Sequence, residues 1–207
     1  KVIEFEKNIS KLLKSKFVVS VGSGTDALFL SLKALGIKEG DEVITPSYTF
    51  YATIGAIVTA GAKPVFVDIK EDYNLDESLI EKKITKKTKA ITVVHYLGNP
   101  VDVKKLKLLA RKYKLYLLED CALALGASVE KKHVGLIGDA GFFSFYPVKQ
   151  KTTGEGGMII LNSKKYSKLL RKKKAFGYNK SLDQRVYPGL YDVDQLGFNY
   201  RMSELHA

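Results

Sequence analysis

Residues Gly141–Leu161 read GFFSFYPVKQKTTGEGGMIIL. The apolar runs at the two ends of this stretch, GFFSFY and GMIIL, predict two strands, and a glycine-rich turn leads into the second. The connection between them holds two lysines, Lys149 and Lys151. Because the chain has 34 lysines and arginines, solvated loop lysines are the simplest interpretation of both. A lysine directly after a buried strand can also take part in catalysis. The rest of the sequence is therefore needed to distinguish a solvated lysine from a catalytic one.

The composition is that of a globular protein with a basic surface. The 207 residues, 45% of them hydrophobic, suffice for a core in one large domain or two small ones. A net charge of +12 favours anionic partners such as phosphorylated metabolites, nucleic acid or a membrane surface. The single cysteine, Cys121, excludes an internal disulfide, and no Cys/His cluster has zinc spacing. We therefore expect a cytoplasmic protein without a metal site.

Both ends of the chain read as internal to a longer protein. The first residues, KVIEFEKNIS, contain neither an initiating methionine nor an apolar leader. The last residues, FNYRMSELHA, stop in what reads as the first turn of a helix, with Ser203 as its cap. Residues 43–62 carry no charge, but threonine, proline, serine and tyrosine near their start indicate a buried segment and not a membrane span.

Short apolar runs alternate with segments of helical period along the whole chain. The predicted strands are 16–21, 41–47, 63–69, 89–97, 114–120, 141–146 and 157–161. The predicted helices are 25–36, 50–61, 76–84, 102–113 and the basic segment 164–176. Strands that are apolar on both faces and separated by helices imply a mostly parallel sheet covered on each side. The predicted fold class is α/β, a three-layer α/β/α sandwich, and one domain over residues 1–207 because no repeat or linker interrupts it.

Candidate site residues follow the predicted strands, because ligands of open α/β sheets bind beyond the carboxyl ends of the strands. The turn Ser23, Gly24 and Thr25 follows the first strand and opens a helix, whose free N–H groups suit a phosphate. Such a turn is also common in a helix that is merely well capped. Glu119 and Asp120 end another strand, and since neighbours on a strand point to opposite faces, only one can face a pocket. A carboxylate there can equally cap the next turn.

Two further strand ends complete the set. Phe50 lies in the hydroxyl- and aromatic-rich run TPSYTFYAT, where a core position is the simpler interpretation when it is taken alone, and Lys149 follows GFFSFY. Together these segments offer a phosphate cradle, an aromatic plate, an acid and a lysine that can form a Schiff base. Pyridoxal phosphate requires all four, for its phosphate, its ring, its pyridine nitrogen and its aldehyde.

Seven segments resemble those of one known family in their residues and in their order along the chain. They are SGTDAL, GDEVITPSYTFYAT, AGAKPVFVDI, TKAITVVHYLGNPVD, LLEDCALALGA, GDAGFFSFYPVKQKTTGEGGMI and GFNYRMSELHA. These segments are similar to those of the DegT/DnrJ/EryC1/StrS sugar aminotransferases, pyridoxal-phosphate enzymes of aminotransferase fold type I. The resemblance implies that residues 1–207 are the cofactor-binding large domain of that fold and that a smaller C-terminal domain is missing. It also implies homodimers whose active sites lie at the subunit interface.

The resemblance assigns catalytic roles to two residues. It implies that Lys149 forms the Schiff base and that Asp120 pairs with the pyridine nitrogen of the cofactor. Lys151 and Glu119 match no role in the family pattern. The implied cofactor-binding residues are Ser23, Gly24, Thr25, Phe50, Asp120, Ser144, Lys149 and Asn199.

The other cofactor contacts follow from the same comparison of motifs. The resemblance implies that Phe50 stacks on the ring and that Ser144 and the Gly24–Thr25 turn bind the phosphate. It also implies that Asn199, in GFNYR, approaches the phosphate from the partner subunit. One position departs from the family pattern, which commonly reads Asp-x-Ala-Gln with the glutamine bonded to the ring hydroxyl. Here the segment reads DCAL, and Leu123 cannot make that bond.

The leading functional hypothesis is transfer of an amino group, with glutamate as the usual family donor, to the keto group of a nucleotide-linked deoxy sugar. A deoxysugar dehydratase of the same family is the nearest alternative. Its branch has a histidine in place of Lys149, whereas Leu123 and the following ALGA are closer to the dehydratase pattern. Another class, a nucleic-acid-binding protein that uses KKYSKLLRKKK, lacks any helix-turn-helix, RNP-like or zinc-finger pattern. A non-catalytic regulatory homologue is disfavoured because Lys149 and Asp120 are both present.

Overall fold

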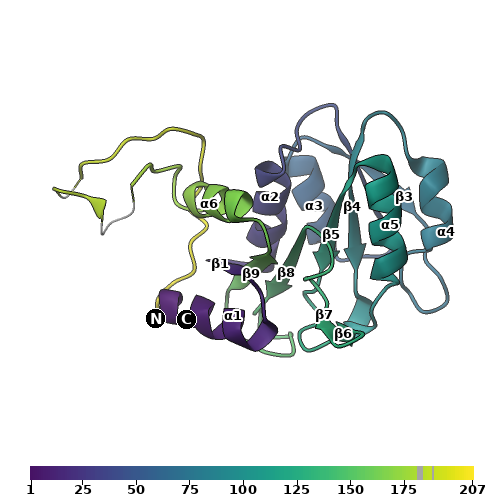
Figure 1. Ribbon diagram of the computed structural model, residues 1–207, viewed down its shortest axis with the longest axis horizontal. Helices are drawn as coiled ribbons and strands as arrows, with labels where there is room; N and C mark the ends of the chain where they lie inside the picture. Colours follow the sequence, from purple (N-terminus) through teal and green to yellow (C-terminus); the bar gives the residue numbers. More distant parts are fainter. Residues whose placement is uncertain (181–183, 188) are drawn as a thin grey trace.

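A single seven-stranded sheet forms the centre of the molecule (Figure 1). The computed structural model describes residues 1–180, 184–187 and 189–207. The strands lie in the order β1-β9-β8-β5-β4-β2-β3. Their bounds are β1 (Phe17–Val21), β2 (Glu42–Pro46), β3 (Lys63–Val67), β4 (Thr88–Val94), β5 (Tyr116–Asp120), β8 (Ala140–Ser144) and β9 (Gly157–Leu161). Only β9 runs antiparallel to its neighbours, so the sheet is mostly parallel, as predicted.

Helices cover both faces of this sheet. On one face lie α2 (Gly24–Ala34), α3 (Tyr51–Thr59) and α6 (Lys164–Lys173), and on the other lie α1 (Val2–Leu13), α4 (Glu77–Ile80) and α5 (Val103–Tyr113). Strand residues alternate between the two cores: Phe142 packs with α2, whereas the next residue, Phe143, faces the α1 side. This arrangement is the predicted three-layer sandwich.

The predicted helices and strands are confirmed, with differences at their ends. The strand predicted for 89–97 stops at Val94, because Tyr96–Gly98 forms a 3₁₀ turn in which Leu97 has a positive φ of 48°. The helix predicted for 76–84 is one α-turn followed by a 3₁₀ turn, Glu81–Lys83. At the C-terminal end, residues 204–206 form a turn, and the Ser203 hydroxyl accepts the Leu205 N–H at 3.0 Å.

Two features were not predicted from the sequence. One is α1, which packs its apolar side chains Val2, Phe5, Ile9 and Leu13 against the sheet. The other is a small hairpin of β6 (Ser128–Val129) and β7 (Lys132–His133). The uncharged stretch 43–62 is divided between β2 and α3, and no helix in the described part of the chain is both long and apolar enough to cross a membrane.

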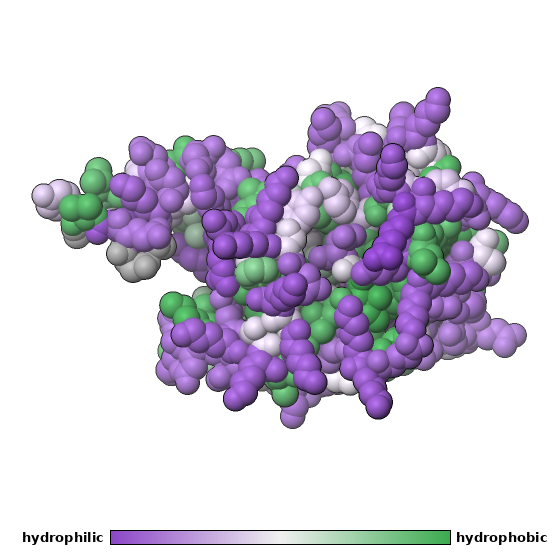
Figure 2. Space-filling view, viewed as in Figure 1, coloured by the Kyte–Doolittle hydropathy of each residue, from purple (hydrophilic) through white to green (hydrophobic). Residues whose placement is uncertain are grey.

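After α6 the described residues of an arm, 175–180, 184–187 and 189–200, extend from the body to the left in Figure 1. Its base is closed by backbone hydrogen bonds from Phe176 N–H to the Phe198 carbonyl at 2.9 Å and from Tyr200 N–H to the Lys174 carbonyl at 3.0 Å. Figure 2 shows apolar side chains on this arm among hydrophilic ones. The exposed apolar side chains of the arm include Val186, Tyr187, Leu190, Val193 and Leu196.

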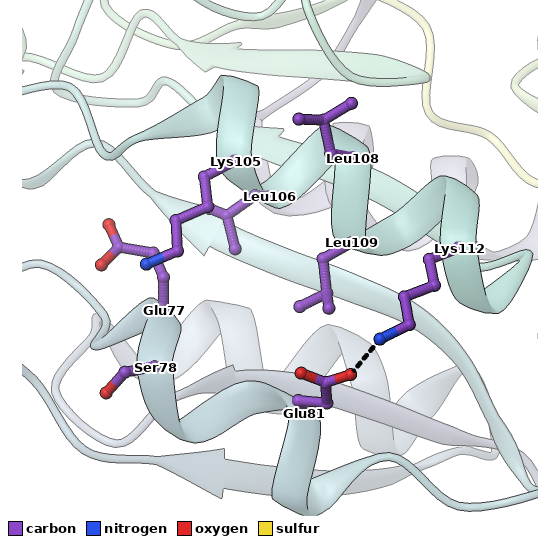
Figure 3. Close-up of a pocket in the computed structure, with 8 residues that line it drawn as sticks. All are labelled: Glu77, Ser78, Glu81, Lys105, Leu106, Leu108, Leu109 and Lys112. Carbon is purple, nitrogen blue, oxygen red and sulfur yellow. Dashed lines mark hydrogen bonds and ion pairs between the residues drawn. The ribbon is translucent and has the colours of Figure 1, made fainter.

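A shallow groove separates α4 from α5 on the opposite face of the sheet from α2 (Figure 3). Leu106, Leu108 and Leu109 line it, and Lys112 closes one end through an ion pair with Glu81 at 2.6 Å. None of the predicted site residues belongs to this groove. The candidate chemistry lies elsewhere, at the carboxyl ends of the parallel strands.

Candidate active site

Asp120 is the last residue of β5, and it faces the layer of α2 and α3. Its Oδ2 accepts a hydrogen bond from the Thr53 hydroxyl of α3 at 3.3 Å, and its Oδ1 accepts the Ala122 N–H at 2.9 Å. Burial raises the pKa of Asp120, while the Ala122 N–H, the charges of His95 and Lys149 and the Thr53 hydroxyl act in the opposite direction. The carboxylate is thus held by two hydrogen-bond donors at the end of a strand.

Glu119 points to the other face, as the strand alternation predicts. Its side chain is fully buried and accepts hydrogen bonds from His95 Nε2 at 3.2 Å, Gly135 N–H at 2.8 Å and Ile137 N–H at 2.9 Å. Burial would raise the pKa of Glu119, but the bond and charge of His95 and the backbone donors outweigh it, so the pKa is lowered. Glu119 therefore anchors the loop 135–138 to β5 and does not face the Asp120 side.

Lys149 lies in the connection between the antiparallel strands β8 and β9. A tight turn holds its backbone, because the Lys149 N–H donates to the Tyr146 carbonyl at 3.0 Å. The Thr152 hydroxyl fastens the same connection by donating to the Phe145 carbonyl at 2.8 Å. The Lys149 side chain is half-buried, and its charge acts on the Asp120 carboxylate, whereas Lys151 is exposed. The structure thus distinguishes the two lysines of the connection.

The predicted phosphate turn is built by close backbone packing. Ser23 caps α2, with its hydroxyl accepting the Asp26 N–H at 3.0 Å. A Cβ on Gly24 would lie 2.8 Å from the Ser144 Cβ, so only glycine lets Ser144 approach the start of the helix. Gly157 at the end of the glycine-rich turn is equally constrained, since its Cβ would lie 2.3 Å from the Ser23 carbonyl oxygen. The two motifs, SGTDAL and TTGEGGMI, therefore form one surface.

The three remaining predicted site residues, Phe50, Thr25 and Asn199, are all exposed. Phe50 is 67% exposed at the start of α3, so the interpretation of Phe50 as a core residue is wrong and its ring is open to a stacking partner. Thr25 is exposed in the first turn of α2. Asn199 is exposed at the base of the arm and pairs with Ala175. Within the described residues, the Asn199 side chain makes no hydrogen bond to the other predicted site residues.

The arrangement fits pyridoxal phosphate at three of its four sides. The first-turn N–H groups of α2, which lack partners inside the helix, lie beside Ser144 and suit a phosphate. The Asp120 carboxylate suits a pyridine nitrogen, and the Lys149 amine suits an aldehyde. The fourth side, the ring hydroxyl, has no side-chain donor from Leu123, whose backbone carbonyl instead accepts a hydrogen bond from the Gln150 side-chain amide.

Two site residues were not singled out from the sequence. Thr53 is 1% exposed and bonds Asp120, and Thr49 bonds Thr53, with 2.9 Å between their hydroxyl oxygens. The signal for them was present in TPSYTFYAT, because residues four apart share a face at the start of a helix. Hydroxyl side chains at that spacing, close to a strand end, predict a shared partner.

Comparison with known proteins shows the family of the chain. The sequence profile of the DegT/DnrJ/EryC1/StrS aminotransferase family matches residues 1–207. The chain belongs to this family. A curated relative, the UDP-4-amino-4,6-dideoxy-N-acetyl-beta-L-altrosamine transaminase of Campylobacter jejuni, is 39% identical over 208 residues, which are 99% of this chain and 54% of the relative. The chain thus spans about half the length of the curated relatives that it matches.

Solved structures that resemble this chain show the same fold. The aminotransferase from Psychrobacter cryohalolentis superposes with a TM-score of 0.93 at 38% identity, over 99% of this chain and 53% of that chain. NtdA from Bacillus subtilis, solved with bound cofactor PMP, superposes with a TM-score of 0.88 at 32% identity, over 99% of this chain and 45% of that chain. The fold is that of the large domain of fold type I aminotransferases, which confirms the family and the fold class predicted from the sequence.

Proposed function

We propose that this chain is the cofactor-binding large domain of a pyridoxal-phosphate-dependent aminotransferase that aminates a nucleotide-linked keto sugar. The observation that carries the proposal is the meeting of three groups at the carboxyl ends of the strands. They are the Asp120 carboxylate, the Lys149 amine whose charge acts on it, and the turn formed by Gly24 against Ser144. These groups serve the pyridine nitrogen, the aldehyde and the phosphate of one cofactor.

Each side chain has a separate task in the proposed site. When bound, pyridoxal phosphate supplies an electron-withdrawing ring that carries an amino group between two substrates. Asp120 keeps the pyridine nitrogen protonated through its charge, and Phe50 covers one side of the ring with its exposed face. Ser144 and the N-terminus of α2 bind the phosphate. Lys149 holds the cofactor and then moves a proton at the substrate carbon.

The proposed substrates are glutamate and a nucleotide-linked deoxy sugar with a keto group. The Campylobacter jejuni relative is named for a UDP-linked amino sugar, which supports this class of substrate. The net charge of +12 suits the diphosphate of such a compound. In the balanced reaction the amino group leaves glutamate, which becomes 2-oxoglutarate, and the sugar ketone becomes an amine.

We also propose that the enzyme works as a cytoplasmic homodimer with shared active sites. The arm supports a second copy of this chain as partner, because it extends from the body (Figure 1) and its side chains Val186, Tyr187, Leu190 and Leu196 expose apolar surface. In such a dimer Asn199, which bonds none of the other site residues described in its own chain, would serve the phosphate of the partner's site. The single, buried cysteine, Cys121, suits a reducing compartment.

One observation favours the dehydratase alternative: Leu123 offers only its backbone carbonyl on the side of the ring hydroxyl. Lys149 favours amination, because release of an amino sugar needs a lysine that moves the proton and recovers the cofactor.

The test is stoichiometric and uses the full-length protein with glutamate and a panel of nucleotide-linked keto sugars. We expect one 2-oxoglutarate for each amino sugar formed, measured by mass spectrometry of both products. Release of a deoxygenated keto sugar together with ammonia would establish the dehydratase instead.

A further inference from the structure

Two threonines outside the assigned cofactor contacts form a chain of hydroxyls that ends on Asp120. The oxygens of Thr49 and Thr53 lie 2.9 Å apart, and Thr53 Oγ1 lies 3.3 Å from Asp120 Oδ2. Each hydroxyl has one proton to donate. Because an ionised carboxylate can only accept, Thr53 donates to Asp120 and Thr49 therefore donates to Thr53. The direction of both bonds follows from the charge at the end of the chain.

We propose that Thr53 is a positioning residue that, with Thr49 behind it, fixes the Asp120 carboxylate for the pyridine nitrogen of the cofactor. The proposal rests on the proposed function, in which Asp120 is that partner. Asp120 ends β5 and has one other hydrogen-bond donor, the Ala122 N–H, on its Oδ1. Without Thr53, Oδ2 would have no protein donor among the described residues, and the carboxylate could rotate about its side-chain bond.

A helix-capping role does not account for these contacts. The N-cap position of α3 is Phe50, which makes no side-chain capping bond. Within the described part of the chain, the Thr49 hydroxyl contacts the Thr53 hydroxyl and no backbone N–H. Thr53 is 1% exposed, so its hydroxyl needs partners inside the protein. The carboxylate and Thr49 are the partners that the structure provides.

The charge of the Asp120 carboxylate depends on pH. The groups that act on the Asp120 carboxylate are the Ala122 N–H, the charges of His95 and Lys149, and the Thr53 hydroxyl, all of which favour the ionised form, against burial, which disfavours it. Removing the Thr53 donor leaves burial less opposed, so a larger fraction of Asp120 is protonated as the pH falls. A protonated Asp120 cannot hold the pyridine nitrogen in its charged form.

The experiment measures the dissociation constant of pyridoxal phosphate from the full-length protein by absorbance, in alkaline buffer and in mildly acidic buffer. Thr53→Val should bind the cofactor about tenfold more weakly than wild type in acidic buffer, the equivalent of one hydrogen bond to a charged group. In alkaline buffer the loss should be smaller, because Asp120 stays ionised there and only the orientation of its carboxylate is affected. Thr53→Ser, which keeps the hydroxyl, should restore the wild-type values at both.

Three further variants make the result decisive. Thr92→Val is the matched control, because Thr92 is buried and its hydroxyl has no partner among the residues that the structure describes, and it should bind the cofactor as wild type does. Thr49→Val leaves Thr53 in contact with Asp120 and should give a smaller acid-dependent loss than Thr53→Val. Asp120→Asn should lose affinity in alkaline and acidic buffer alike.

The outcomes separate the inference from the proposed function. Wild-type binding by Thr53→Val in acidic buffer, an equal loss in both buffers, or failure of Thr53→Ser to restore binding would each overturn the role of Thr53. Wild-type binding by Asp120→Asn would overturn the assignment of Asp120 itself. A loss in Asp120→Asn without one in Thr53→Val leaves that assignment intact and rejects the positioning role alone.

Discussion

At the scale of single residues, environment separates side chains that the sequence leaves equivalent. Glu119 and Asp120 are adjacent carboxylates, yet one is fully enclosed by His95 and backbone donors while the other faces α3. Lys149 and Lys151 are two residues apart, yet one is half-buried and acts on Asp120 while the other is exposed. The alternation of strand side chains predicts the first difference. No local rule predicts the second, because it depends on how the connection between β8 and β9 folds back.

The difference between the two lysines is open to a direct test. Borohydride reduction of the full-length, cofactor-loaded protein should fix the cofactor to the peptide of Lys149, because the charge of that amine acts on the Asp120 carboxylate. Lys149→Ala should abolish the adduct and lower turnover by roughly 10²–10⁴-fold, the usual contribution of a proton-transferring group. Lys151→Ala serves as the control and should retain both. An adduct on Lys151 in the wild-type protein would contradict the assignment.

At the scale of elements, the phosphate turn depends on contact between segments that are far apart in the sequence. The start of α2 contacts β8 at Ser144 and the start of β9 at Gly157. At both contacts a side chain in place of the glycine would overlap the neighbouring atoms. The requirement for glycine therefore comes from tertiary contacts and not from the local backbone conformation. A sequence shows that the glycine is there, but the structure is needed to show which neighbour excludes a side chain.

This contact predicts an order of effects in two variants. Gly24→Val should weaken binding of pyridoxal phosphate roughly tenfold, because its Cβ would lie 2.8 Å from the Ser144 Cβ and overpacking of this kind costs about 1–3 kcal/mol. Thr25→Val should have a smaller effect, since Thr25 is exposed and contributes through its backbone N–H. Dialysis followed by absorbance measures cofactor retention in both. Equal loss in the two variants would show that close backbone approach is not the reason for the glycine.

The elements also show how far the sequence could predict the fold. Buried strands and the helices that cover them were predictable, because burial requires apolar residues in a pattern that differs between the two. A continuous apolar run marks β9, and apolar residues at helical spacing mark α5. The helix α1 was not predicted, although Val2, Phe5, Ile9 and Leu13 repeat at helical spacing, because no capping side chain marks its start. The place of β1 beside β9 was not predictable, since pairing at a sheet edge is fixed by long-range contacts.

At the scale of the whole molecule, one buried ionic cluster joins the beginning of the described chain to its last helix. Glu6 of α1 bonds the Ser20 N–H of β1 at 2.9 Å and pairs with Arg171 of α6 at 2.7 Å and with Lys174 at 3.4 Å. Lys174 also donates to the Ser20 carbonyl at 2.7 Å. The cluster thus joins α1 and β1, near the start of the sequence, to α6. Ser20, which takes part in it, lies three residues before Ser23 of the phosphate turn.

The ionisation of Glu6 links this cluster to pH. Burial would raise the pKa of Glu6, but the charge of Lys174 and the hydrogen bonds of Arg171 and Ser20 outweigh it, so the pKa lies below its ordinary value of 4.5. A carboxyl group with a lowered pKa stabilises the folded state above the ordinary value, and that stabilisation disappears as the pH falls through the lowered one. Protonation of Glu6 would leave the buried ammonium of Lys174 without its counter-charge.

We therefore expect Glu6→Gln to lower the free energy of unfolding by roughly 3 kcal/mol at neutral pH, the cost of breaking a buried ion pair. The difference from wild type should shrink as the pH falls below 4.5, because the wild-type carboxylate is then progressively lost. Urea unfolding of the full-length protein over this pH range measures both quantities. Glu4→Gln is the matched control, since Glu4 lies exposed in the same helix and should change stability little. A Glu6→Gln deficit that stays constant with pH would mean that packing, and not charge, holds α1 and α6 against β1.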